Sequence, residues 1–263
     1  MTSGFTELAS VDGAIAPTAE AMVPLKDDGL YRGDGAFEVI RLYEGRPFAL
    51  TDHIDRLQRS GAAIEMEFDR PALESEIAAL LTAAGDIDGQ LRLIVTRGGR
   101  RIAATEPVPA HAETVSVATV TYSTTIILEG VKSLSYAANM QATRIAKGRG
   151  ADEAVLIRPD GTVLEPPTSS IFWASAEGPL RTSALTDGVL ESITRDRLVK
   201  VLDVEQGSWQ VDDLLGAHEA FLASTTREIQ AVAAIDGRQL GEAPGPRTRE
   251  AQAAFATTLE KEL

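Results

Sequence analysis

The stretch GAFEVIRLYEGRPFALTDHIDRL, residues 35–57, holds the local signals that decide the fold class. Its first part is rich in β-branched and aromatic residues on both sides of Glu44-Gly45-Arg46, and this pattern predicts a β-hairpin. Thr51 and Asp52 follow, where their side chains can cap a helix. A hairpin that leads directly into a helix is typical of mixed α and β structure.

The rest of the chain continues this mixed order. The further predicted elements are a helix over residues 72–85, strands over 90–99 and 113–122, a helix from about Ser135 to Arg149, a hairpin of AVLI and TVLE around Pro159-Asp160-Gly161, strands over 170–175 and 180–185, a helix over 192–203 that Ser192 caps, a strand over 219–225, a hairpin with Asp236-Gly237 at its turn, and a closing helix from about Pro246. Because strands and helices do not alternate strictly, the sequence predicts a two-domain α+β fold rather than a doubly wound sheet.

A polar stretch rich in threonine and serine, TVTYSTTIIL at residues 119–128, is the best candidate for a domain boundary. It predicts a small N-terminal α+β domain over residues 1–122 and a larger C-terminal domain over residues 123–263. The C-terminal domain of this division carries Lys132.

The composition favours a globular protein that acts on small molecules. A chain of 263 residues, 44% of them hydrophobic, can bury a sizeable core. The formal net charge of −14 disfavours binding to nucleic acid and to anionic membranes, since both need a basic surface. The sequence has no run of about 18 apolar residues and no N-terminal basic segment followed by an apolar one, so we expect a cytoplasmic location.

The residue types exclude several kinds of catalytic site. The chain has no cysteine, which excludes disulfides, thiolate catalysis and cysteine-ligated zinc. Its histidines, His53, His111 and His218, lie far apart and form no metal-binding pattern, so no metal site is expected. The G-x-S-x-G motif of many serine hydrolases is also missing.

Lys132 is a candidate for chemistry because of its surroundings. It is the only charged residue between Glu129 and Arg144, in a stretch of small and apolar residues. A lysine becomes a nucleophile when burial and neighbouring groups lower its pKa and fix its position. Taken alone, this stretch still favours an exposed lysine at the entrance to a helix.

Six motifs in order along the chain change that interpretation. They are residues 32–57, VKSLSYAANMQA at 131–142, GADEAVLI at 150–157, TVLEPPTSSIFW at 162–173, VLESITRD at 189–196, and ASTTREIQAVAAIDGR at 223–238. Together they resemble the class IV aminotransferases, pyridoxal-phosphate enzymes that include the D-amino-acid and branched-chain types. The resemblance covers nearly the whole chain and implies the two-domain fold type IV architecture.

The resemblance implies that Lys132 forms the internal aldimine with pyridoxal 5'-phosphate and then carries the proton. Glu165 stands where the family places the carboxylate that keeps the pyridine nitrogen protonated, without which the ring is a poor electron sink. Tyr136 would contact the phenolic oxygen of the cofactor, and Leu190 would pack against one face of the ring. From the residues alone, Tyr136 is equally a half-buried core tyrosine.

The resemblance also assigns the contacts to the cofactor phosphate. Arg56 matches the phosphate-binding arginine, and its planar fork suits a phosphate. From spacing alone, Arg56 can instead pair with Asp52 at i,i+4 separation. Ile193 and Thr194 open a predicted helix, whose first amides form an anion site. The remaining implied contacts are Ser224 and Thr225.

The chain departs from the family pattern at three points. It has Pro166-Pro167 where many relatives carry glycine after the glutamate, Ser170 where they carry asparagine, and Glu191-Ser192 where they carry Pro-Gly. These changes leave the cofactor set intact, but they leave the substrate side of the site open.

A transaminase needs a group that binds the substrate carboxylate. The candidates for substrate contact are Arg32, Phe37, Arg97, Arg100 and Thr226, with Arg101 and Arg92 as further basic side chains. Three arginines in TRGGRR, residues 96–101 of an acidic protein, indicate an anionic ligand near that loop. Each of these arginines alone is equally a solvated surface charge.

The preferred function is an amino-acid transaminase that acts as a homodimer, an assembly implied by the resemblance. Two alternatives stay open. Aminodeoxychorismate lyase, which releases pyruvate, shares the cofactor residues, and RGDG and the TRG strand also occur in lyase-like relatives. A non-catalytic binding protein that kept the fold is the third reading, and the presence of both Lys132 and Glu165 disfavours it.

Overall fold

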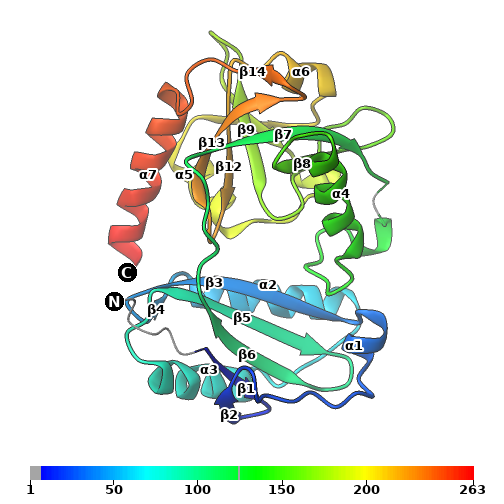
Figure 1. The fold of residues 1–263 in the computed structure, drawn as a ribbon, viewed down its shortest axis with the longest axis vertical. Helices are drawn as coiled ribbons and strands as arrows, with labels where there is room; N and C mark the ends of the chain where they lie inside the picture. The colour runs from blue at the N-terminus through cyan, green and yellow to red at the C-terminus, as the bar shows by residue number, and fades with distance from the viewer. Residues whose placement is uncertain (1–6, 124) are drawn as a thin grey trace. The chain divides into compact units, whose positions relative to one another are not determined.

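The computed structural model describes residues 7–123 and 125–263, which form two compact units (Figure 1). Unit 1 comprises the chain up to Ala110 together with Val131–Tyr136 and Glu262–Leu263, and unit 2 comprises His111–Gly130 and Ala137–Lys261. Each unit is built on its own sheet, so the predicted α+β class is confirmed. Among the described helices, none is both long and apolar enough to cross a membrane.

Unit 1 contains an antiparallel six-stranded sheet in the order β2-β1-β6-β5-β3-β4. Its strands are β1 (Leu8–Val11), β2 (Ala14–Pro17), β3 (Gly35–Tyr43), β4 (Arg46–Pro47), β5 (Gly89–Thr96) and β6 (Arg101–Glu106). Its helices are α1 (Asp28–Arg32), α2 (Leu50–Ala63) and α3 (Arg70–Ala84). Helix α2 packs on β3, and α3 packs on β1 and β6.

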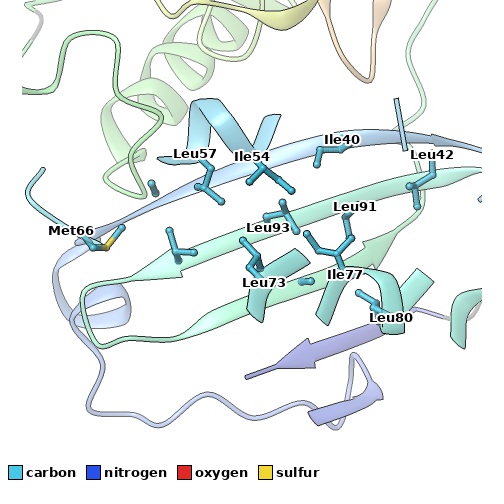
Figure 2. Packing of buried hydrophobic residues seen from close by; sticks show 13 residues of the cluster. Ile40, Leu42, Ile54, Leu57, Met66, Leu73, Ile77, Leu80, Leu91 and Leu93 are labelled. Carbon is cyan, nitrogen blue, oxygen red and sulfur yellow. The ribbon is translucent and has the colours of Figure 1, made fainter. Parts of the chain in front are cut away.

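The core of unit 1 lies between the sheet and helices α2 and α3 (Figure 2). Side chains alternate along β3, so Ile40 and Leu42 point into this core while their neighbours do not. Ile54 and Leu57 of α2 meet them, and each is at most 1% exposed. Burial of one such side chain stabilises the fold by about 1.5–3 kcal/mol, so this layer fixes α2 against β3.

Unit 2 contains an eight-stranded mixed sheet in the order β11-β10-β9-β12-β13-β7-β8, with β14 paired to β13. Its strands are β7 (Thr114–Thr121), β8 (Glu153–Ile157), β9 (Ser170–Ala174), β10 (Leu180–Ser183), β11 (Val204–Gly207), β12 (Glu219–Ser224), β13 (Glu228–Ile235) and β14 (Arg238–Gln239). Its helices are α4 (Ala137–Gly148), α5 (Ile193–Val201), α6 (Val211–Leu215) and α7 (Pro246–Glu262), with short 3-10 turns at Ile126–Leu128 and Leu185–Asp187. Helix α4 packs on β7 and β8, and α5 packs on β12.

The division into units differs from the predicted boundary between residues 122 and 123. Strand β7 pairs in parallel with both β13 and β8, so the chain from His111 already belongs to the second sheet. The segment Val131–Tyr136 then returns to unit 1. Lys132 therefore lies in unit 1, and not in the C-terminal unit as the sequence predicted.

Several predicted element ends also need correction. Thr51 and Asp52 do not cap α2, because the helix begins at Leu50 after Ala49, which has a left-handed φ of 53°. The predicted strand TVLE forms only two isolated bridges, between Val163 and Ile157 and between Thr162 and Gln210. Strand β6 was not predicted, because its six residues start inside the arginine-rich loop.

Candidate active site

The backbone around Lys132 is fixed against the start of β3. Strand β4 pairs only with Leu42 and Tyr43, which leaves the other end of that edge of β3 open. The Phe37 N–H donates to the Lys132 carbonyl oxygen at 3.0 Å, and the Leu134 N–H donates to the Gly35 carbonyl oxygen at 2.9 Å. This pairing explains why α4 begins at Ala137 and not at Ser135.

Glycine is required at position 35 because two segments pack closely around it. A Cβ added to Gly35 would clash with the Val95 carbonyl oxygen of β5, and it would lie 2.6 Å from Leu134 Cδ1. The backbone of β5 cannot move aside as the end of a leucine side chain can. Gly35 therefore serves the pairing of β3 with β5 first, and it also leaves room for Leu134 of the segment that carries Lys132.

The Lys132 side chain lies over an aromatic pair. Its Nζ is 4.5 Å from the centroid of the Phe37 ring, a cation–π distance. The rings of Phe37 and Tyr136 meet edge to face, with centroids 5.3 Å apart and planes at 86°. The Lys132 N–H donates to Ser60 Oγ of α2 at 3.2 Å. Lys132, Tyr136 and Phe37, three of the residues predicted for the site, are therefore brought together.

Arg56 lies buried on α2 and binds a carboxylate of β3. Its Nε donates to Glu38 Oε1 at 2.7 Å, and its Nη2 donates to Glu38 Oε2 at 2.6 Å. His53 Nδ1 lies 2.8 Å from the same Oε2. Burial of Glu38 by itself raises the pKa of its carboxyl, but Arg56 and His53 outweigh this effect and hold that pKa at about 2. Glu38 is therefore ionised and can only accept.

His53 is the neutral member of this group. Burial lowers the pKa of its imidazole; Glu38 opposes that effect, and the charges of Arg56 and Lys132 add to it. The ring is thus uncharged at pH 7, and its Nδ1–H donates to Glu38. His53, Arg56 and Ser60 follow one another at helical spacing and form a buried polar stripe on α2. Ile54 and Leu57 form the apolar stripe beside it.

Sequence reasoning missed Glu38 and His53. A signal for Glu38 was present, because it stands between Ala36 and Ile40 on the buried face of a strand that alternates. A carboxylate in that row must have a buried partner. Nothing in the sequence named His53 as that partner beyond its place one turn before Arg56.

Arg97 and Arg100, predicted to contact substrate, bind carboxylates of unit 1. Arg97 Nε donates to Asp34 Oδ2 at 2.5 Å, and its Nη2 donates to the Ile64 carbonyl oxygen at 2.6 Å. Arg100 Nη1 forms an ion pair with Asp12. Both guanidinium groups therefore tie the β5–β6 loop to other segments of unit 1.

Arg32, the third predicted arginine, ends helix α1. Its side chain is 76% exposed and lies 3.7 Å from Asp28 at i,i+4 spacing. Such an exposed pair restrains the side chain weakly. Of the three arginines, Arg32 is the one whose guanidinium is most accessible.

In unit 2, the carboxylate of Glu165 meets the segment before α5. The Leu190 N–H donates to Glu165 Oε1 at 2.8 Å, and both residues are half-buried. This hydrogen bond fixes one carboxylate oxygen and brings together two of the predicted cofactor residues. Pro166 and Pro167 follow Glu165 and end the extended segment, since neither can donate a backbone hydrogen bond.

The N-terminus of α5 supplies donors for an anion. Ser192 Oγ accepts from the Arg195 N–H at 3.3 Å, which confirms the predicted cap. Ile193 and Thr194 occupy the first turn, where amide groups have no partner within a helix. Thr194 is fully buried, and within residues 7–123 and 125–263 its Oγ1 has no hydrogen-bond partner. A buried hydroxyl without a partner beside such amides fits a phosphate oxygen.

The predicted second phosphate contact lies at the end of β12. Helix α5 packs on this strand, which ends at Ser224. Thr225 and Thr226 form the turn to β13 with Arg227, whose N–H donates to Ser224 Oγ at 3.4 Å. Both threonines are half-buried, and both carry a hydroxyl group, so this turn is a second candidate for binding an anion.

Known proteins match most of this chain. The family model for amino-transferase class IV matches residues 35–235. A D-alanine aminotransferase from Bacillus licheniformis is 33% identical to this chain over 95% of it and 96% of the relative.

Two solved structures share the fold. One is a hypothetical aminotransferase from Mycobacterium tuberculosis in its PLP-bound form, with a TM-score of 0.85 and 25% identity over 95% of this chain and 97% of that one. The other is a branched-chain aminotransferase from Thermoproteus uzoniensis with norvaline, with a TM-score of 0.84 and 28% identity over 98% and 96%. Since the family model spans most of the sequence and the relatives align from end to end, this chain belongs to the class IV aminotransferase family.

Proposed function

We propose that Lys132 is the cofactor-bonding and proton-carrying residue of this aminotransferase. The observation that supports this role is the position of its amine over Phe37, whose ring meets that of Tyr136, on a backbone that is hydrogen-bonded to β3. A lysine that must give and take a proton has to be held in place, and this pairing holds it. Family membership makes pyridoxal phosphate the cofactor.

The donors of the chain fit the phosphate of that cofactor. Thr194 Oγ1 is buried without a partner in the described chain, and the first-turn amides of α5 are next to it. We assign the phosphate to Ile193, Thr194, Ser224 and Thr225, with Arg56 as the cationic contact. Glu38 neutralises Arg56 and orients it, so the guanidinium can offer a fixed edge rather than a mobile charge.

The proposed chemistry follows from the charges of the remaining residues. When bound, pyridoxal phosphate supplies an electron sink that stabilises negative charge at the substrate carbon. Glu165 holds a proton on the ring nitrogen, with one carboxylate oxygen fixed by the Leu190 N–H. Lys132 would take the proton from the substrate α-carbon and deliver it to the carbon on the other side of the amino nitrogen. Tyr136 donates to the phenolic oxygen, and Leu190 covers one ring face.

The proposed substrates are an amino acid as donor and a 2-oxo acid as acceptor. One relative is a D-alanine aminotransferase, and another is a branched-chain aminotransferase. The Mycobacterium tuberculosis aminotransferase was also solved with α-ketoglutarate and PMP bound. Phe37 and Thr226 are proposed to line the substrate site. For the substrate carboxylate, the exposed Arg32 is a better candidate than Arg97 and Arg100, whose guanidinium groups bind Asp34 and Asp12.

We also propose that the protein is a homodimer. Met22 and Leu25 are 84% and 72% exposed, and Ile126 and Ile127 are 79% and 81% exposed. The first pair belongs to unit 1 and the second to unit 2. Exposed large apolar side chains are candidates for an interaction site, and a second copy is the partner that family membership favours. Sedimentation of the pure protein tests this assembly, and a monomer at micromolar concentration would contradict it. The cytoplasmic location stays a prediction.

An assay with both donor types tests the function. The pure protein with pyridoxal phosphate and 2-oxoglutarate should form glutamate from D-alanine or from L-leucine, and Lys132→Ala should not. The same protein is then given aminodeoxychorismate. Pyruvate release from that compound, with no amino transfer from any donor, would favour the lyase instead.

A further inference from the structure

Arg227 lies in the turn between β12 and β13, directly after Thr225 and Thr226. Arginine side chains in turns normally extend into solvent, yet this one is 9% exposed. Burial lowers the pKa of the guanidinium, and the charge of Glu153 opposes this effect. A buried charge needs specific partners, so the contacts of Arg227 indicate which segments it connects.

The first contact is with Glu153, at the start of β8. Arg227 Nη2 lies 3.3 Å from Glu153 Oε2, and the Glu153 side chain is also 9% exposed. The other carboxylate oxygen accepts from Thr143 Oγ1 of α4 at 2.7 Å. Arg227 Nη1 donates to Gln230 Oε1 of β13 at 2.8 Å. The turn is thus tied to β8, to α4 and to β13.

The second contact reaches the segment that follows Glu165. Arg227 Nη2 also donates to Thr168 Oγ1 at 3.4 Å. Thr168 lies three residues after Glu165, in a turn closed by the Ser169 N–H, which donates to the Pro166 carbonyl oxygen at 3.5 Å. Pro166 and Pro167 have no N–H to donate, so few backbone hydrogen bonds can hold this turn. The side-chain contact from Arg227 supplies an anchor.

We propose that Arg227 is a positioning residue that holds the Thr225 turn and the Glu165 segment at a fixed separation. This inference rests on the proposed function, in which Thr225 binds the cofactor phosphate and Glu165 meets the ring nitrogen. A buried ion pair adds little net stability compared with apolar packing, but it sets a geometry. The phosphate and the ring nitrogen belong to one small molecule, so a change in the separation of their protein partners should lower its affinity.

The test measures dissociation constants of pyridoxal phosphate and of pyridoxal, which lacks the phosphate, for apo-protein variants. Arg227→Gln should lower the affinity for pyridoxal phosphate at least about tenfold, the effect expected when an outer partner of a ligand-binding group is lost. The affinity for pyridoxal should fall less, because pyridoxal has no phosphate to contact the turn. Glu153→Gln should act in the same direction, and the double variant should lose no more than the larger single loss, since both changes break one link.

Arg181→Gln is the matched control. Arg181 pairs with Asp213 at 3.3 Å in the same unit and has no role in the proposed site, so its pyridoxal phosphate affinity should stay within about twofold of wild type, as for an ordinary ion pair. If Arg227→Gln does not fold, Arg227→Lys replaces it in the test, and its affinity for pyridoxal phosphate should fall by an intermediate amount.

Two results would overturn the inference. One is wild-type affinity for pyridoxal phosphate in folded Arg227→Gln and Glu153→Gln. The other is an equal loss for pyridoxal phosphate and pyridoxal, which indicates a general loss of structure. If wild type itself binds no pyridoxal phosphate, the proposed function fails instead, so the two failures are distinguishable.

Discussion

The predicted cofactor residues of unit 1 and those of unit 2 are fixed in different ways. In unit 1, Arg56 belongs to a buried polar group whose members hold one another, since Glu38 binds both Arg56 and His53. In unit 2 the donors are mainly hydroxyl and amide groups placed by the start of α5 and by the β12–β13 turn. Removing a group from the first set should therefore cost stability, whereas removing one from the second should cost affinity.

Glu38→Gln should give the largest effect on folding. The glutamine leaves Arg56 buried without a counter-charge, which costs about 3–5 kcal/mol of the free energy of unfolding. Urea unfolding of the apo-protein measures this. Glu106→Gln is the control, because Glu106 pairs with Arg92 of the same sheet but at 24% exposure. Equal losses in the two variants would show that the buried group of unit 1 is not special.

Acid should destabilise the protein through the same carboxyl group. The pKa of Glu38 is about 2 in the folded protein and 4.5 ordinarily, a difference that corresponds to roughly 3 kcal/mol. Because the folded pKa is the lower one, this stability is fully present above pH 4.5 and is lost as the pH falls toward 2. Unfolding free energies of wild type and Glu38→Gln between pH 6 and pH 3 check the sign. Parallel curves would contradict the assignment.

Thr194→Val should change affinity and leave stability intact. The hydroxyl is buried without a partner in the described residues, so a methyl group in its place removes an unsatisfied polar atom. Pyridoxal phosphate should bind about tenfold more weakly, equivalent to the loss of one hydrogen bond to a charged group.

Thr248→Val provides the contrast. Thr248 is equally buried, but its Oγ1 lies 2.7 Å from Glu219 Oε1. That variant should lose stability while cofactor affinity stays constant. If Thr194→Val destabilises the fold as much as Thr248→Val, its hydroxyl is structural and the phosphate assignment fails.

Arg100→Gln should give the smallest effect. Its guanidinium binds Asp12, so the KM for any amino donor should change by no more than about twofold, as for a half-exposed ion pair. Arg32→Gln, at the exposed end of α1, should raise that KM more. Steady-state kinetics of the two variants decide which arginine serves the substrate, and a larger change in Arg100→Gln would reverse the choice.

Local signals predicted many elements of the fold. Turn residues marked the β3–β4 and β13–β14 hairpins, and Ser192 marked the start of α5, because each signal lies within a few residues of its effect. The return of Val131–Tyr136 to unit 1 could not be predicted this way, since it depends on pairing with Gly35 and Phe37, about a hundred residues earlier. Pairings so distant leave no periodic trace in a single sequence.

The candidate site shows the same limit. Lys132, Arg56 and Glu165 were found by resemblance, which reads motifs rather than geometry. Their fixing partners, such as Glu38 for Arg56, were missed because a buried ion pair is defined in space and its members lie in different elements. The arginines of TRGGRR illustrate the opposite case. A basic cluster is visible in sequence, whereas the carboxylates that bind it are scattered.

The role of Lys132 is tested most directly by the visible spectrum of the protein with pyridoxal phosphate. Wild type should show an absorption band that persists after dialysis. Lys132→Ala should lose that band, while Lys200→Ala, a change in a 68% exposed lysine of α5, should keep it. Identical spectra for wild type and Lys132→Ala, whether both coloured or both colourless, would contradict the assignment of Lys132.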